Sequence, residues 1–446
     1  MKIKEAKQAA KLNLRLFICF RMLFNARFYY PVYALLFLEH GLSWEDFGIL
    51  NGIWAITIIL LEVPSGALAD TLGRKKLLVL AAICMVVEML ALLFAPMNGS
   101  EYVFLLFALN RIVSGLAEAA ASGADEALAY DSLKEAGMET EWNKALEKAQ
   151  RYTSLAFFFA MMTGSAFYDA SFINSCIHTI GLDFTMTSQD AVKAPIFLTL
   201  LSSLVVLGAA LGMKDSFARE KMGAWETMRT SFKKTVQAGS WIWKTPLPFG
   251  ILIGAMALDN VIRQFLTIAS AYWNVIELPV ATFGLVASGM SLMGIFIPRL
   301  ARHLGDKFSP QKNFLFLCLI LTVGLWGIGF AIPYWGILPA VLLYATMQIM
   351  NYLVSRYLNE EASSERRATV LSFRGLTTNI SYGAVSLLYS GLIAWIKLSE
   401  IDPIVMGRKM NEQDSVFVQA LGWFPWYFIF TIFLVMAFYS IRFRKK

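Results

Sequence analysis

The stretch with the densest potential chemistry runs from Asn110 to Glu126, in an otherwise apolar part of the chain. Its Arg111, Glu118 and Asp125 are spaced by sevens, so on a helix they lie within about 40° of one face. Ionisable groups in an apolar membrane segment are costly, and we expect them to face a wet cavity or one another. Such a row could relay a proton, or it could only tie neighbouring helices together.

Charged residues also interrupt other apolar segments. Arg21 and Arg27 are six residues apart in the first of these segments, about 240° around a helix, so their side chains cannot face the same point. Asp259 and Arg263 are four residues apart, the spacing of a self-neutralising helical pair. Glu88, in a third segment, has no partner that the sequence identifies.

The composition is that of a membrane protein, since 57% of the 446 residues are hydrophobic and only 16% are charged. Apolar runs long enough to cross a bilayer predict twelve spans, at about 12–38, 46–69, 76–96, 102–123, 151–173, 194–213, 247–272, 281–302, 312–332, 334–356, 368–395 and 420–441. The basic stub before residue 12 lacks a cleavable signal pattern. The four cysteines and three histidines have no disulfide or metal-ligand spacing, so we expect no metal and no cofactor.

The basic residues indicate the orientation of these spans. Of the 39 Lys and Arg residues, only Lys193, Lys397, Arg408 and Lys409 fall in the predicted outer loops, and most of the others lie in the predicted cytoplasmic segments. Short loops retained inside the cell are rich in Lys and Arg. We therefore expect both termini on the cytoplasmic side of an inner membrane. The net charge of +7 then reflects orientation in the bilayer and does not indicate nucleic-acid binding.

A short turn joins the second and third spans. Gly66 and Gly73 permit close approach and chain reversal, and basic residues follow them directly. The turn resembles the signature loop between helices 2 and 3 of the major facilitator superfamily, G-x-x-x-D-[RK]-x-G-[RK]-[RK]. Five positions match it, and Thr71 departs from it where a base is usual; the matching residues are Gly66, Asp70, Gly73, Arg74 and Lys75.

The second half of the chain contains a partial repeat of this turn. Pro298 and Gly305 each lie 232 positions after Gly66 and Gly73. The resemblance implies an all-α fold of two six-helix bundles with the transport site between them. We expect bundles at 1–213 and 247–446, joined by a cytoplasmic linker at 214–246. The helical spacing of apolar residues in that linker fits a helix on the inner membrane surface, and a solvated linker is an equal alternative.

The resemblance also implies roles for single residues. Arg111 matches the arginine of the helix 4 motif that is associated with proton coupling in many members, and Glu118 is its titratable neighbour. Residues 122–133 resemble a bacterial branch whose substrates are mostly unassigned. The turn itself would act as a gate, with Asp70 near the start of helix 11. Arg74 would pair with an acid at the end of helix 4, and the candidates are Asp125, Glu126 and Asp131.

In that fold helices 1, 4, 7 and 10 line a central cavity, which assigns further residues to the substrate. They are aromatic or polar residues of helices 1, 7 and 10: Arg21, Tyr29, Tyr33, Asp259, Arg263, Gln348 and Asn351. Arg21 is nearer the bilayer midplane, so we expect it to contact the substrate. Arg27 would then pair with an acid of another helix, such as Asp169.

These features predict a secondary active transporter, not an enzyme, that acts as a monomer on a small organic solute and is coupled to protons. Arg21 and Arg27 have no evident partner in the sequence, which favours an anionic or carboxylate-bearing solute. A drug or metabolite efflux antiporter is the alternative within transport, although only Gly164 remains of the Gly-Pro-x-x-Gly-Gly pattern of helix 5. A non-transporting sensor on the same fold is the alternative outside it. No phosphate-binding loop indicates an ATP-driven pump.

Overall fold

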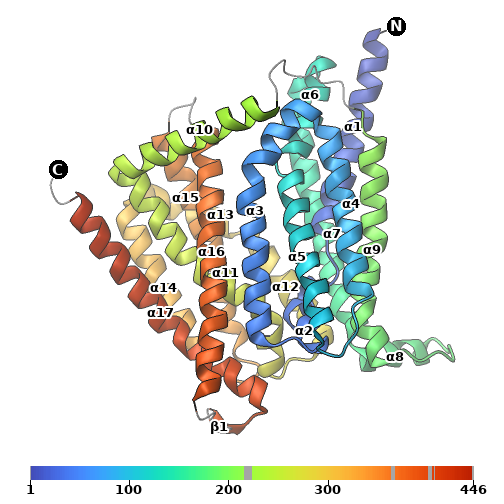
Figure 1. Ribbon diagram of the computed structural model, residues 1–446, viewed down its shortest axis with the longest axis vertical. Helices are drawn as coiled ribbons and strands as arrows, with labels where there is room; N and C mark the ends of the chain where they lie inside the picture. Colours follow the sequence, from blue (N-terminus) through green and yellow to red (C-terminus); the bar gives the residue numbers. More distant parts are fainter. Residues whose placement is uncertain (1, 215–223, 363–366, 400–403, 406, 444–446) are drawn as a thin grey trace. The chain divides into compact units, whose positions relative to one another are not determined.

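A computed structural model describes residues 2–214, 224–362, 367–399, 404–405 and 407–443. Its regular elements are helices apart from one short antiparallel pair of strands, β1 (Ile404–Val405) and β2 (Arg408–Lys409) (Figure 1). The α-helices in chain order are α1 (Lys2–Asn25), α2 (Tyr33–Glu39), α3 (Trp44–Leu72), α4 (Arg74–Leu93), α5 (Glu101–Ala121), α6 (Ala124–Glu135), α7 (Trp142–Tyr168), α8 (Ala170–Thr179), α9 (Ser188–Gly212), α10 (Ala224–Lys244), α11 (Pro246–Val275), α12 (Phe283–Leu292), α13 (Ile297–Lys307), α14 (Pro310–Gly329), α15 (Ile337–Glu361), α16 (Arg367–Leu398) and α17 (Glu412–Phe443). Four short 3-10 helices, η1 (Tyr30–Val32), η2 (Glu139–Glu141), η3 (Val280–Thr282) and η4 (Met293–Ile295), complete the described elements.

The chain forms two compact units. Unit 1 comprises residues 1–42, 56–232 and 280–288, and unit 2 comprises residues 43–55, 233–279 and 289–446. The division falls within α3, α10 and α12. The stretch predicted as a surface helix or a solvated linker is thus helical from Ala224 to Lys244. Its position on a membrane remains a prediction.

In unit 1, α4 packs against α5 and α9, and α1 packs against α6, α7 and α9. The core between these helices is built from phenylalanines of α1 and small or aliphatic residues of α4, α5 and α9, among them Phe17, Phe20, Leu78, Met85 and Val206. Burial of such side chains holds the helices together and determines where their few polar residues meet.

In unit 2, α11 packs against α15, α16 and α17, while α14 packs against α15 and α17. Of the apolar segment of α11, 72% is buried inside the protein, whereas only 22% of that of α17 is buried. Polar groups on α11 are therefore the ones most in need of partners within the protein.

Nine helices of the described residues are long and apolar enough to span a membrane, or up to eleven if two bent pairs each count as one span. The bent pairs correspond to the predicted fifth and eighth spans. The fifth turns by 92° between α7 and α8, and the eighth by 44° before α13. The predicted count of twelve remains a prediction, because the first predicted span is interrupted.

That interruption positions the candidate site. The predicted span 12–38 is divided into α1, a break at residues 26–29, η1 and α2. Pro31 contributes to the break, because it lacks the amide hydrogen that would bond to the Arg27 carbonyl in a continuous helix. The Phe28 amide donates instead to Oγ1 of Thr199 in α9, 3.0 Å away. The expectation of one continuous helix through this region is therefore wrong.

Candidate functional site

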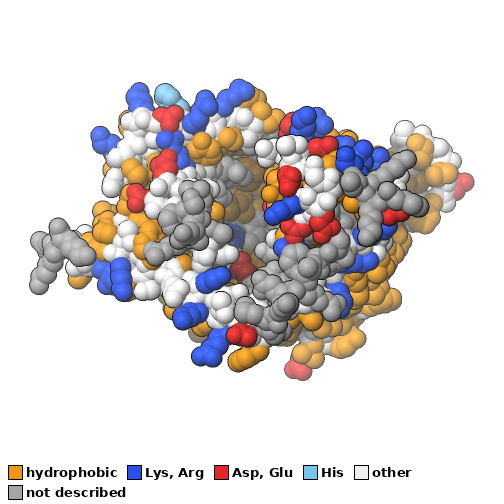
Figure 2. All heavy atoms as spheres, turned by 90° about the horizontal axis from the view of Figure 1, so that it is seen from above, with side chains coloured by type: hydrophobic (Ala, Val, Ile, Leu, Met, Phe, Trp, Pro, Cys, Tyr) orange, Lys and Arg blue, Asp and Glu red, His pale blue; other side chains and the backbone are white. Residues whose placement is uncertain are grey.

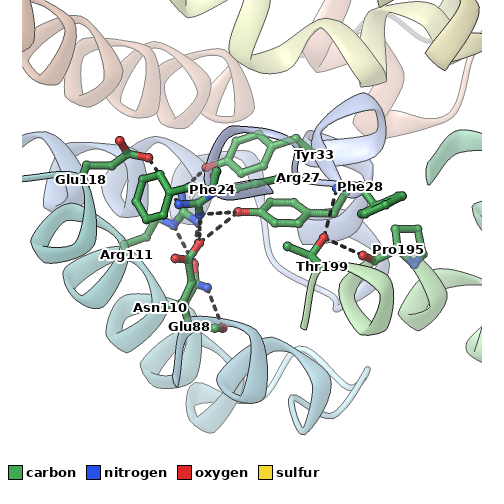
Figure 3. Close-up of polar contacts among 11 residues, drawn as sticks. Phe24, Arg27, Phe28, Tyr33, Glu88, Asn110, Arg111, Glu118, Pro195 and Thr199 are labelled. Atoms are coloured by element: carbon green, nitrogen blue, oxygen red, sulfur yellow. Dashed lines mark hydrogen bonds and ion pairs between the residues drawn. The ribbon is translucent and has the colours of Figure 1, made fainter. Parts of the chain in front are cut away.

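The break in the first helix brings Arg27 into the interior of unit 1 (Figure 3). Its side chain is 1% exposed and lies over the ring of Phe24, 5.3 Å from the ring centroid. The break can pack this closely because residue 164 of α7 is a glycine. A β-carbon on Gly164 would lie 1.7 Å from the carbonyl oxygen of Phe28. The one glycine that survives from the expected helix 5 pattern is thus required by the packing.

Arg27 binds two carboxylates from two helices. Its Nη1 forms an ion pair with Oε1 of Glu88 on α4, and its Nη2 lies 3.3 Å from Oε1 of Glu118 on α5. The hydroxyl of Tyr29 also donates to Oε1 of Glu88, at 3.0 Å. The two acids differ in exposure, since the Glu88 side chain is 0% exposed and that of Glu118 is 37% exposed. In Figure 3 the three charged side chains point toward one another.

Arg111 on α5 lies beside this group but is held by neutral residues. Its Nε and Nη2 donate to Oδ1 of Asn110 at 2.9 and 2.6 Å, and its Nη1 donates to the hydroxyl of Tyr33 at 2.6 Å. The amide of Asn110 in turn donates to the backbone carbonyl of Glu88, at 3.0 Å. Asn110 therefore links the two arginine sites across α4 and α5.

We refer to these residues together as the unit 1 cluster: Arg27, Tyr29, Tyr33, Glu88, Asn110, Arg111 and Glu118. It contains two guanidinium groups and two carboxyl groups, so its charges balance when both acids are ionised. Because Glu88 and Glu118 both contact Arg27, the guanidinium would keep one carboxylate if the other lost its charge. Chemically, such an arrangement can accept and release one proton.

The structure corrects the predicted partner of Arg27. Asp169 does not contact it, and instead Oδ1 of Asp169 caps α8 by accepting from the Phe172 amide at 3.0 Å. The prediction treated the first helix as continuous, which turns Arg27 toward another neighbour. Glu88, for which the sequence offered no partner, is the acid that binds it.

Arg21, expected to contact the substrate, has two carboxylate partners in unit 1. Its Nη1 forms an ion pair with Glu126 and lies 3.6 Å from Oδ2 of Asp125. The reason for assigning Arg21 to an anionic solute was its lack of a partner, and that reason does not hold. The same contacts remove Asp125 and Glu126 from the candidate partners of Arg74.

The predicted gate is described in part. Arg74 forms an ion pair with Asp131 and donates to the carbonyl of Ala127 at 2.8 Å, so the turn before α4 is tied to α6. Gly73 has φ +103°, which suits glycine and confirms the chain reversal. A β-carbon on Gly66 would meet nothing within 4 Å, so the expected close approach there is not seen. The side chain of Asp70 lies outside the described residues, and Lys75 follows Arg74 in the first turn of α4.

Unit 2 holds a second polar group, which we call the unit 2 cluster: Asp259, Arg263, Asn351, Arg374 and Asn379. Asp259 and Arg263 form the predicted helical ion pair, at 2.7 Å, and Arg263 also donates to Oδ1 of Asn379 at 2.9 Å. Arg374 on α16 donates to Oδ1 of Asn351 on α15 at 2.7 Å.

Gln348, also assigned to the substrate, lies in α15 and is partly buried. The residues that the sequence analysis left without a function are Glu88, Asn110 and Arg374. Each is a polar residue within an apolar helix, and a polar residue in that setting is the sequence feature that could have indicated a role.

The geometry defines a helical membrane protein with balanced charges buried inside one unit. A sequence profile of the Major Facilitator Superfamily matches residues 16–386. The chain belongs to this superfamily, whose members are transporters.

Solved structures show the same fold at low sequence identity. A variant of the nucleoside transporter NupG is 13% identical, with a TM-score of 0.69 over 96% of this chain and 99% of that one. A bacterial homologue of the human lysosomal transporter Spinster is 14% identical, with a TM-score of 0.69 over 98% and 97% of the two chains. A D-xylose–proton symporter is 14% identical, with a TM-score of 0.60 over 95% and 96%. No curated protein sequence matches the chain.

Proposed function

We propose that this transporter moves a small organic solute by alternating access and that Glu118 carries the coupled proton. The observation behind the proposal is the difference between the two acids that share Arg27. Glu88 is fully buried against Arg27. Glu118 is 37% exposed while its carboxylate stays 3.3 Å from the guanidinium. A group that must load and release protons needs both water access and a partner that senses its charge.

Charge balance supports the same assignment. When Glu118 takes up a proton, Arg27 remains neutralised by Glu88, so the buried guanidinium is never left without an anion. The positive charge of Arg111 then acts more strongly on its surroundings, because the nearby negative charge of Glu118 no longer offsets it. A change of this kind is a means by which protonation could bias one conformation over another. The likeness to a D-xylose–proton symporter supports proton coupling as a property that this fold can carry.

The proton proposal is tested in proteoliposomes with a solute found by a thermal-shift screen on the purified protein. Glu118→Gln should abolish uptake driven by a pH gradient and spare solute-for-solute exchange, since exchange needs no net proton movement. Glu147→Gln, at an exposed position of α7, is the matched control and should keep both activities. Equal pH dependence in the wild type and in Glu118→Gln would remove Glu118 from the mechanism. Binding without any flux would favour the sensor alternative.

We also propose that the turn from Gly66 to Lys75 acts as a gate. The support is the connection of Arg74 to Asp131 and Ala127, which makes the turn and α6 move together. Asp131→Asn should therefore change the rate of solute exchange and leave the thermal stability of the solute-bound protein nearly unchanged. Asp70→Asn should act on the same rate. Normal exchange by both variants under every gradient would contradict the gate.

A further inference from the structure

Among the residues that the structure describes, the second arginine of the unit 2 cluster, Arg374, has no anionic partner. Arg374 lies within α16, in a predicted span, and is partly buried. The one hydrogen-bond partner of its side chain among the described residues is Oδ1 of Asn351, a neutral oxygen that accepts from Nη2 at 2.7 Å. No carboxylate of the described part of the chain lies within ion-pair distance of it. The charged groups that act on Arg374 are Asp259, which attracts it, and Arg263, which repels it.

The one acid that acts on Arg374 within the described part of the chain is already paired. Asp259 lies 2.7 Å from Nη2 of Arg263 on the same helix. The unit 2 cluster therefore holds two guanidinium groups and one carboxylate and keeps one uncompensated positive charge. An unpaired charge in an apolar environment is costly, and proteins retain such groups where a ligand or another charge meets them.

The unused hydrogen-bonding groups of the Arg374 and Asn351 side chains are of one kind. The Nε and Nη1 groups of Arg374 donate to no described residue, and the amide nitrogen of Asn351 makes no described bond, since its oxygen is the atom turned to Arg374. All of these groups are donors. The planar fork of a guanidinium matches the two oxygens of a carboxylate, so donors in this arrangement suit that group best.

We propose that Arg374 and Asn351 bind a carboxylate group of the transported solute. This inference rests on the proposed transport function and deepens it, because it assigns the substrate class and moves the anion contact from Arg21 to Arg374. Arg374 is the better candidate since Arg21 already has Glu126 and Asp125 as partners, whereas Arg374 has a neutral one.

The first test is binding to the purified full-length protein, measured as the rise in melting temperature. The probes are carboxylates paired with neutral analogues, namely benzoate with benzamide, succinate with succinamide and glucuronate with glucose, and glucose 6-phosphate serves as a phosphate probe. At least one carboxylate should stabilise the wild type more than its neutral counterpart. Arg374→Gln should weaken that binding on the order of 30-fold, and Arg374→Lys should weaken it less because the charge remains. Arg229→Gln, at an exposed position of α10, should bind like the wild type.

The second test places the anion in the protein. Asn351→Asp would put a carboxylate where Arg374 now meets an amide oxygen. It should raise the melting temperature of the ligand-free protein and abolish the shift caused by the carboxylate. This variant keeps the test decisive even if Arg374→Gln folds poorly.

The proposal is overturned if no carboxylate probe stabilises the wild type, if only the phosphate probe does, or if Asn351→Asp leaves the shift intact. Loss of the carboxylate shift in Arg374→Gln and Asn351→Asp supports it. Because these readouts need no proton gradient, they stand apart from the proton proposal. A failure of Glu118→Gln to change coupling would leave them unaffected, and their failure would leave the coupling test valid.

Discussion

The two clusters hold arginines within apolar helices in different ways. In unit 1, Arg27 is 1% exposed and shares two carboxylates from α4 and α5. In unit 2, Arg263 is 25% exposed and meets one carboxylate of its own helix, and Arg374 meets a neutral amide. In the function proposed above, the unit 1 cluster changes its charge by one proton and Arg27 remains paired. In the inference drawn above, an anion from outside the protein completes the unit 2 cluster.

This difference teaches what each cluster is able to sense. A balanced cluster with one water-accessible acid responds to pH, because protonation changes its net charge. A cluster with a standing positive charge responds to an anionic ligand. A transporter that couples a proton to an anionic solute needs both kinds of cluster. Substitutions that change the charge balance of either cluster test this difference.

The largest effect is expected for Glu88→Gln. Removing the fully buried partner of Arg27 leaves that guanidinium with Glu118 alone, at a cost of roughly 3–5 kcal/mol. Glu62→Gln is the matched control, since Glu62 is a partly buried acid of α3 with one oxygen that has no described hydrogen-bond partner. Thermal unfolding should show a large loss for Glu88→Gln and little change for Glu62→Gln. Equal losses would mean that Glu88 is not the permanent counter-ion.

Gly164→Ala should have the next largest effect on stability. The added methyl group would meet the Phe28 carbonyl, so the break must move and carry Arg27 with it, at a cost on the order of 3 kcal/mol. Gly208→Ala in α9 is the control, because a β-carbon there meets nothing within 4 Å. That substitution should be neutral or slightly stabilising, since alanine favours helix. Thermal unfolding of both variants checks the order.

Asp259→Asn tests the unit 2 side of the comparison. The cost should be smaller, about 1–2 kcal/mol, because Arg263 is partly exposed and keeps Asn379 as a partner. The substitution leaves two uncompensated guanidinium groups, so the protein should be stabilised more strongly by added carboxylate than the wild type. A weaker response would show that Asp259, and not the excess of positive charge, sets the affinity.

Thr199→Val should have the smallest effect. It replaces the hydroxyl that accepts from the Phe28 amide with a methyl group of similar shape, at a cost of about 1 kcal/mol. Ser203→Ala, which removes a hydroxyl bonded only within α9, is the comparison and should cost less. Thermal unfolding of the two variants separates support of the break from ordinary helix effects.

The sequence was sufficient for the helical class, the membrane character and the superfamily, because apolar runs and the signature turn are local patterns. It was also sufficient for the Asp259–Arg263 pair, whose partners are one helical turn apart. It could not pair Arg27 with Glu88, since those residues are 61 positions apart and meet only through packing of separate helices.

The break at residues 26–29 shows the same limit from another side. Pro31 was visible in the sequence, but the effect of proline depends on whether other groups can satisfy the freed backbone. Here Thr199 accepts from Phe28 and Gly164 leaves room for it, and neither contact has a signature in the sequence. The sequence analysis gave Asn110 and Arg374 no role, because the role of each depends on the charged side chains that packing places beside it.

The pairing of Arg27 has a consequence for the order in which the protein is made. Glu88 and Glu118 are synthesised 61 and 91 residues after Arg27, so the first membrane segment emerges from the ribosome with a cation whose counter-ions do not yet exist. At about 5–20 residues per second, that interval lasts several seconds. We therefore expect the first segment to reach its final packing only after α4 and α5 have been made.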